Sequence, residues 1–354
     1  MPDDDRTMKA GPDGAAPSGD RTIVFTSSDR KVKVESIELP SGEDLTKYFS
    51  PQPPDKYGGE QFVDCGGMKL ILKVRDKDTS RNVAMAVMFK AGDRSQLARF
   101  IQEARITANL EHPNIVPVHE IGIKPSGEPY FTMKLLGGET LSQIFDKLRA
   151  GDQAYAARYG LYELLVIFRK ICDAVAFAHS KGVIHLDLKP GNVQVGEFGE
   201  VLVLDWGLAK IIGSREEGAG APQQPRHILP DEGTTSCMTL DGEALGTPGY
   251  MAPEQAAGRN RQKDERTDIF SLGTILYCVL TLEKPFVGAS KDEIIRKTMQ
   301  GSFTAPELRA PSRNVPRSLS AVVMKAMSAR PEDRYQRVAD LVAEIDAFTA
   351  GYAT

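Results

Sequence analysis

One short stretch of the chain, residues 185–210, holds side chains that could carry out chemistry together. It reads HLDLKPGNVQVGEFGEVLVLDWGLAK, and its candidates are Asp187, Lys189, Asn192 and Asp205. Carboxylate and amide oxygens are hard ligands that suit Mg²⁺, and a carboxylate can also accept a proton. Phosphoryl transfer needs a base for the acceptor hydroxyl, metal ligands, a cation on the nucleotide phosphates and a lid over them. The stretch contains groups suited to the first two of these tasks.

The same stretch resembles the catalytic and metal-binding loops of protein kinases, in which HRDLKxxN is followed by DFG. Further family motifs follow in order, namely GTPGYMAPE at 246–254, DIFSLG at 268–273 and RPEDRY at 330–335. The resemblance covers about residues 57–348. Within this range the sequence is similar above all to bacterial, Hanks-type serine/threonine kinases. It implies an α+β, bilobal fold with a small β-sheet lobe carrying one main helix and a larger, mainly helical lobe.

The resemblance assigns roles to the matching residues. Asp187 would accept or orient the proton of the substrate hydroxyl, and Lys189 would contact the transferring phosphate. Asn192 and Asp205 would hold Mg²⁺, or Mn²⁺ in its place, beside ATP. The spacing of Lys189 from Asp187, together with Thr247 before PGYMAPE, favours serine and threonine acceptors on protein substrates, including the chain itself.

The lid and the phosphate-binding lysine depart from the family pattern. Where the family has GxGxxG, this chain retains Gly66 and Gly67, while Asp64 stands at the first glycine position and Lys69 at the third. The strand expected to read VAxK reads VAMA, so Ala86 takes the place of the lysine that anchors ATP. Because charge neutralisation supplies much of this catalysis, an active enzyme needs a replacement cation.

We expect Lys69 to be that replacement. It begins a predicted strand directly after the glycine turn, where alternate side chains face the phosphates. Lys90 lies four residues beyond Ala86, roughly 13 Å further along an extended strand. The with-no-lysine group of eukaryotic kinases resembles this chain in the same paired change, and Glu103 matches the glutamate that orients such a lysine. The alternative is that Lys69 is an exposed loop residue and Glu103 a solvated helix residue.

For the adenine ring, the resemblance points to apolar strand positions and to the backbone that follows them. The cofactor-binding candidates are Gly66, Gly67, Lys69, Ile71, Ala84, Met133, Lys134, Leu136 and Leu204. Gln194 stands where the family generally has an apolar residue beneath the base, which would reshape nucleotide binding.

A third departure is Leu186, which replaces the arginine of the catalytic loop. In the family that arginine pairs with a phosphorylated residue of the activation segment, a contact that leucine cannot make. Thr234 and neighbouring hydroxyls remain candidate phosphorylation sites without this route. Glu254 and Arg334 match the ion pair that ties the activation segment to the large lobe.

Composition limits the function classes. The chain has 354 residues, 26% of them charged, and a formal net charge of −4, which argues against the dense basic face of a nucleic-acid-binding protein. Its four cysteines form no CxxC pair, which is typical of reduced thiols and a cytoplasmic protein. The start, MPDDDR, is acidic, and no apolar run is long enough to cross a membrane.

Periodicity predicts the elements around these motifs. Residues 1–56 are rich in charge, Gly and Pro and read as a disordered or loosely attached tail. We expect a kinase domain over 57–348, with lobes at 57–136 and 137–348, and a tail at 349–354. Strands are predicted on both sides of a helix at 94–110, and further helices at 161–181, 266–282, 290–300, 317–328 and 336–349.

Two functions stay open. The first is a serine/threonine kinase in signalling that transfers the γ-phosphate of Mg-ATP, with Lys69 in place of the missing lysine. The second is a pseudokinase scaffold that binds nucleotide without turnover, which Ala86, Leu186 and Gln194 favour. The joint presence of the four candidates in 185–210 favours the enzyme.

Overall fold

The computed structural model describes residues 50–53, 55–66, 69–88, 94–212 and 245–352. The chain divides into two units, Met1–Lys33 and Val34–Thr354, and every described residue belongs to the second. The predicted tail up to residue 49, Gly67, Lys90 and the hydroxyls around Thr234 lie outside the described residues. The expected domain bounds therefore stay predictions.

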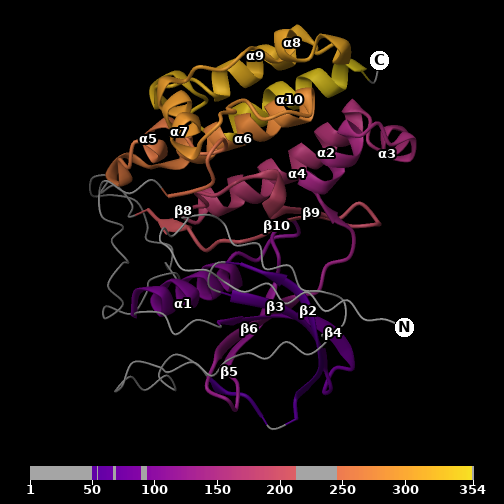
Figure 1. Ribbon diagram of the computed structural model, residues 1–354, viewed down its shortest axis with the longest axis vertical. Helices are drawn as coiled ribbons and strands as arrows, with labels where there is room; N and C mark the ends of the chain where they lie inside the picture. The colour runs from indigo at the N-terminus through magenta and orange to yellow at the C-terminus, as the bar shows by residue number, and fades with distance from the viewer. Residues whose placement is uncertain (1–49, 54, 67–68, 89–93, 213–244, 353–354) are drawn as a thin grey trace, which may run out of the picture. The chain divides into compact units, whose positions relative to one another are not determined.

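A six-stranded sheet forms the small lobe, with the order β1-β5-β6-β4-β3-β2 (Figure 1). All neighbours are antiparallel except β1 and β5, which are parallel. The strands are β1 Ser50–Pro51, β2 Tyr57–Cys65, β3 Lys69–Asp76, β4 Arg81–Met88, β5 Val118–Ile123 and β6 Pro129–Lys134.

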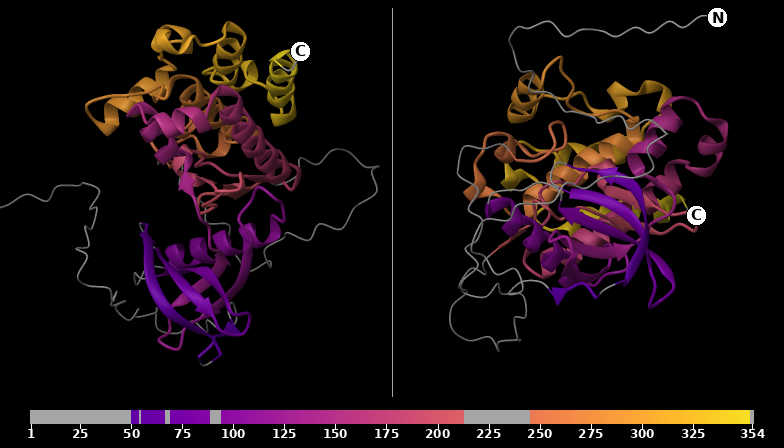
Figure 2. Two further views of the ribbon diagram at one scale, coloured as in Figure 1. Left: turned by 90° about the vertical axis from the view of Figure 1, so that its right-hand side faces the viewer. Right: turned by 60° about the horizontal axis from the view of Figure 1, so that its bottom comes forward.

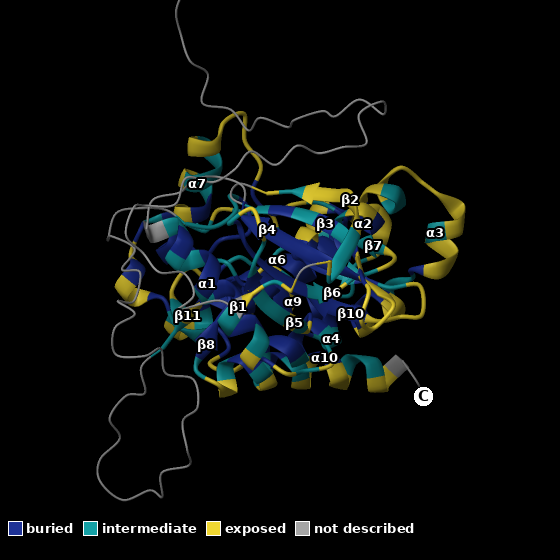
Figure 3. Cartoon of the chain, turned by 90° about the horizontal axis from the view of Figure 1, so that it is seen from below, coloured by how far each residue is buried: buried dark blue, intermediate teal, exposed yellow. Residues whose placement is uncertain are grey.

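The alternation of β3 separates the two faces of this sheet. Leu70, Leu72 and Val74 are buried, whereas Lys69 and the alternate residues after it are partly exposed, as the period of two in a strand requires. In β4, by contrast, the last six residues are all buried, and Figure 3 shows this strand in the colour of buried residues. Both faces of the sheet are therefore covered at its centre.

One face is covered because the sheet curls. Lys56, just before β2, forms an ion pair with Glu120 of β5, although three strands separate β2 from β5 in the strand order. The ring of Tyr57 meets that of Tyr130 of β6 edge-on, with centroids 6.0 Å apart. A strongly twisted sheet can close on itself in this way, and the curl brings the face of Leu72 inward.

The other face is covered by helix α1, Arg94–Asn109, which lies along the sheet (Figure 2). Leu97, Phe100 and Ala104 recur at helical spacing and pack against Ala86 and Phe131. The helix agrees with the one predicted at 94–110. It carries Glu103, which is buried.

The large lobe is mainly helical, as expected. Its long helix α4, Leu161–Ser180, packs against α6, Glu265–Thr281, which is buried on all sides from Thr267 onward. Two-residue strands β8 Val183–Ile184 and β11 Lys210–Ile211 pair, as do β7 Glu139–Thr140, β9 Val193–Val195 and β10 Val201–Val203. The remaining helices are α2 Leu141–Arg149, α3 Gln153–Arg158, α5 Pro253–Ala256, α7 Lys291–Gln300, α8 Pro306–Arg309, α9 Arg317–Ala326 and α10 Val338–Tyr352.

No helix among the described residues is long and apolar enough to span a membrane.

The ion pair expected between Glu254 and Arg334 is present and buried. Two guanidinium nitrogens donate to the two carboxylate oxygens at 2.9 and 2.8 Å, and the side chains are 0% and 4% exposed for Arg334 and Glu254, respectively. Thr267 Oγ1 donates to Glu254 at 2.9 Å, and Arg334 also donates to the carbonyl of Ser328 at 2.8 Å. The pair thus joins α5, α6 and the segment before α10.

Replacing Arg334 with alanine should destabilise the large lobe by about 3–5 kcal/mol, because the carboxylate of Glu254 would stay buried without its cation. The matched control is Arg337→Ala, whose ion pair with Asp340 is exposed and screened by solvent. Urea unfolding followed by circular dichroism measures both. Equal unfolding midpoints for the two variants would contradict this account of the buried pair.

Candidate active site

Lys69 stands at the start of β3, on the sheet face that α1 covers. In the β3–β4 pairing, Lys69 lies opposite Met88, and Ile71 lies opposite Ala86. Residues two apart in a strand share a face, so Lys69 and Ala86 are diagonal neighbours on one side of the sheet.

The ammonium group of Lys69 contacts two carboxylates. It forms an ion pair with Glu103 of α1, and it donates to Asp205 Oδ1 at 3.1 Å. The side chain of Lys69 is 19% exposed, and that of Glu103 is 7% exposed. The structure therefore brings together a strand, a helix and the loop after β10 at one cation.

The charges of this cluster shift the pKa values of its members. Burial alone would lower the pKa of Lys69, but the negative charges of Glu103 and Asp205 raise it above its ordinary value. Burial would raise the pKa of Asp205, yet Lys69 holds it below the usual range. Burial raises the pKa of Glu103 against the opposing effect of Lys69. Lys69 is thus charged and Asp205 ionised at neutral pH.

The end of β2 lies against the start of β3. Cys65 pairs with Leu70, and Gly66 N donates to Lys69 O at 2.9 Å. Asp64 Oδ1 accepts from Cys65 N at 2.7 Å. Lys69 therefore begins β3 beside Gly66, which fixes the position from which its side chain extends.

A second cluster surrounds Asp187. Its carboxylate accepts from Lys189 Nζ at 2.7 Å, and from Thr247 N and Oγ1 at 2.9 and 2.8 Å. Lys189 Nζ also donates to Thr247 Oγ1 at 2.7 Å. Thr247 thereby contacts both Lys189 and Asp187, which precede it by 58 and 60 positions in the chain.

Asn192 and Asp205 offer oxygen ligands from neighbouring segments. Leu204 N donates to Asn192 O at 2.8 Å, which holds the residue before Asp205 against Asn192. Asn192 Nδ2 donates to Asp187 O at 2.9 Å, so the amide oxygen is the atom left for a cation. A carboxylate and an amide oxygen form a donor set that fits Mg²⁺.

His185 and Trp206 pack against each other and link the loops that carry Asp187 and Asp205. Their ring centroids are 4.5 Å apart, and His185 Nε2 lies 3.1 Å from Leu204 O. Both side chains are buried.

Asp268 of α6 holds the backbone of the loop before Asp187, a contact that the sequence alone did not reveal. It accepts from His185 N and Leu186 N at 2.8 and 2.9 Å, and it lies 2.8 Å from His179 Nε2. Burial would raise the pKa of Asp268, but the contacts with His179 and His185 hold it below the usual range. The sequence did offer one indication of a buried role for Asp268, because this carboxylate begins the otherwise largely apolar motif DIFSLG.

Three of the adenine-binding candidates, Ile71, Ala84 and Met133, occupy the same face of the sheet as Lys69. Ala84 lies opposite Met133, and Ile71 and Met133 pack at the edge of the cluster that α1 covers. Leu204 follows β10 directly. Gln194 Nε2 donates to Gly137 O at 3.1 Å, so its amide is tied to the chain that joins the lobes.

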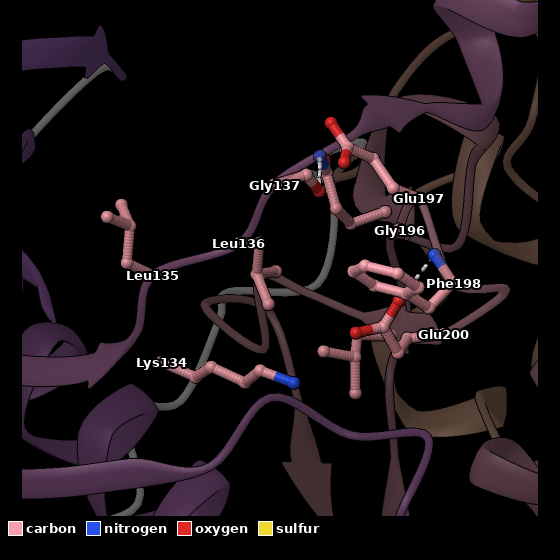
Figure 4. A pocket seen from close by; sticks show the side chains of 10 residues that line it. Lys134, Leu135, Leu136, Gly137, Gly196, Glu197, Phe198 and Glu200 are labelled. Carbon is pink, nitrogen blue, oxygen red and sulfur yellow. Dashed lines mark hydrogen bonds between the residues drawn. The ribbon is translucent and has the colours of Figure 1, made fainter. Parts of the chain in front are cut away.

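A cavity of about 220 Å³ lies beside this connection. Figure 4 shows the residues 134–137 along one side and the turn between β9 and β10, with Glu197, Phe198 and Glu200, along the other. Lys134, Leu136 and Gln194 line it, whereas Ile71, Ala84, Met133 and Leu204 do not. The predicted adenine residues therefore fall into two groups, and their roles stay predictions.

Comparisons with a family model and with curated proteins both match this chain to protein kinases. The family model described as "Protein kinase domain" matches residues 60–344. Serine/threonine-protein kinase PknD of Protochlamydia amoebophila (strain UWE25) is 36% identical over 307 residues, covering 85% of this chain and 30% of the relative. PknD of Chlamydia caviae is 38% identical over 301 residues, covering 84% and 31%.

The chain thus spans about a third of the length of these curated relatives. The matched region includes both lobes and all the residues of the two clusters described above. The chain belongs to the protein kinase family.

Proposed function

We propose that this chain is a serine/threonine protein kinase that transfers the γ-phosphate of Mg-ATP to protein hydroxyls, with Lys69 as its phosphate-binding lysine. The observation that carries the proposal is the contact of Lys69 with both Glu103 and Asp205. The names of the relatives support serine and threonine as acceptors. The family match over 60–344 supports a kinase domain close to 57–348.

The register of the sheet supports the relocation of the lysine. Diagonal neighbours in an antiparallel pair are about 7–8 Å apart, which a lysine side chain can bridge. Ala86 has no side chain beyond Cβ, so the space near Glu103 is available to a lysine from the adjacent strand. Lys73 lies on the same face of β3 but opposite Ala84. It is two residues beyond Ile71, the residue opposite Ala86, and is therefore four residues along the strand from Lys69.

The charges at the site suit a metal–nucleotide complex. Asn192 and Asp205 would hold Mg²⁺, which would supply positive charge to the phosphate oxygens as the γ-phosphate is transferred. Asp205 is ionised because its pKa is lowered. Lys69 stays protonated because its pKa is raised, so it can bind a phosphate oxygen.

Asp187 would act on the acceptor. Its carboxylate is held by Thr247 and Lys189, so it can accept a hydrogen bond from an incoming hydroxyl in a fixed direction. Lys189, which donates to Asp187 at 2.7 Å, would exchange this contact for one with the transferring phosphate. Both residues come from a loop whose backbone is fixed by Asp268.

The competing function is a pseudokinase that binds nucleotide without turnover. The hydrogen bond from Gln194 to Gly137 favours it, because it places a polar amide where the family generally has an apolar residue beneath the base. Retention of Asp187, Asn192 and Asp205 in hydrogen-bonded clusters favours the enzyme.

Lys69→Ala should lower phosphate transfer by roughly 10²-fold or more, because a charge that stabilises the transition state is removed. The matched control is Lys73→Ala, which removes a lysine from the same face of the same strand and should leave transfer nearly unchanged. Transfer of radiolabelled phosphate to the chain and to a generic protein substrate measures both, with Asp187→Asn as the blank. Similar losses in the two lysine variants would exclude Lys69 as the phosphate-binding residue.

The double change Lys69→Gly with Ala86→Lys tests the same idea in reverse. It restores a lysine on β4 facing Glu103, and we expect it to recover at least part of the activity that Lys69→Ala loses. The same transfer assay measures it. Folding of each variant is checked by thermal unfolding, and a folded double variant as inactive as Lys69→Ala would count against a shared ammonium position.

Mg-ATP should change the fluorescence of Trp206, the only tryptophan of the chain. Trp206 is buried directly after Asp205, so a cation on that carboxylate alters the field at the indole. A titration with Mg-ATP measures the change, and Asp205→Asn should remove it. No change with the unaltered chain would argue against nucleotide binding at this loop.

A further inference from the structure

The catalytic loop has an unusual backbone conformation at Leu186, directly before Asp187. Its φ is 66°, in the left-handed region that non-glycine residues rarely adopt. Such a conformation persists only where the surroundings hold it. The peptide that joins Leu186 to Asp187 therefore depends on contacts from outside the loop.

Two side chains hold this backbone, one at the amide and one at the carbonyl of Leu186. Asp268 accepts from Leu186 N at 2.9 Å. Gln255 of α5 donates from Nε2 to Leu186 O at 2.8 Å. The carbonyl of Leu186 belongs to the peptide unit of Asp187, so the amide of Gln255 orients the unit from which the Asp187 side chain extends.

Gln255 also holds the segment that faces the loop. Its Nε2 lies 3.3 Å from Leu245 O, and its Oε1 accepts from Ala252 N at 3.0 Å. The side chain is 0% exposed. An amide uniquely combines two donor hydrogens with an acceptor oxygen, and here all three functions are used.

The segment held in this way is the one that contacts Asp187. Thr247, two residues after Leu245, donates to the Asp187 carboxylate from both N and Oγ1. Between them, Gly246 has a φ of 125°, and a Cβ there would lie 3.3 Å from Leu186 O and 3.4 Å from Gln255 Nε2. The close approach of the two backbones at Gly246 leaves little freedom in how loop and segment meet.

We propose that Gln255 is a positioning residue for phosphate transfer: it sets the direction of the Asp187 carboxylate by fixing the Leu186 carbonyl and the segment of Thr247 at once. Its effect on the reaction rests on the proposed kinase function, but not on Lys69. Gln255 does not itself contact the reacting groups. It acts through the backbone of Leu186 and the hydrogen bonds of Thr247.

Gln255→Met tests this role, because methionine has a similar length and no amide. We expect kcat to fall roughly 10²-fold, as for a displacement of a reacting group by about 1 Å, while KM for ATP changes little. The matched control is Thr298→Val in α7, which removes another buried hydrogen bond, from Oγ1 to Ile294 O at 2.9 Å. This control should lose stability to urea without a comparable loss of kcat. Equal kcat values for the two variants would overturn the proposal.

Hydrogen–deuterium exchange provides a readout that needs no activity. Gln255→Met should speed exchange in peptides covering 185–192 and 245–252, whereas Thr298→Val should leave both unchanged. Unaltered exchange in Gln255→Met would show that the amide does not hold the loop, and would also overturn the proposal. An unaltered chain that transfers no phosphate would instead refute the proposed function, and the exchange result would still decide whether Gln255 fixes the loop.

Discussion

The contact of Lys69 with Glu103 and Asp205 is the interaction on which the rest of the site depends. One amine and two carboxyl groups, from β3, from α1 and from the loop after β10, meet there. Removing such charges from water is costly, and the cost is offset only while the partners remain in contact. The two carboxyl groups share one lysine, so the cluster is suited to a divalent cation, and Mg²⁺ would balance the charge of Asp205.

The catalytic loop is held by a different means, a buried network of uncharged and charged hydrogen bonds in the large lobe. Asp268 fixes two backbone amides, and Gln255 fixes the carbonyl between Leu186 and Asp187. A buried network of this kind is rigid when every group is paired and weak when one is lost. The small lobe thus contributes the ammonium group of Lys69, which ion pairs hold in place. The large lobe contributes the carboxylate of Asp187, which hydrogen bonds hold in place.

Local patterns in the sequence predicted much of this arrangement. The α1 and α4 helices follow from apolar spacing, and Asp187, Asn192 and Asp205 follow from a motif confined to about twenty residues. Contacts between distant segments were not predictable: neither the curl that joins Lys56 to Glu120 nor the bond from Gln255 to Leu186 leaves a local pattern. In the sequence, Gln255 is simply a polar residue that follows Pro253 and Glu254, and nothing there indicates that it bonds to Leu186.

The proposed place of Lys69 has a cost for the lid as well as a gain for the phosphate site. A glycine at the end of the turn would leave the β2–β3 connection free to adapt to the nucleotide. Lysine at this position has a side chain held by two carboxylates, and its carbonyl accepts from Gly66 N at 2.9 Å. The cation and the end of β2 are therefore coupled, because the residue that would bind phosphate is also the one whose carbonyl accepts from Gly66. A strand lysine in the position of Ala86 would separate these two tasks, since it would lie on β4, away from the turn.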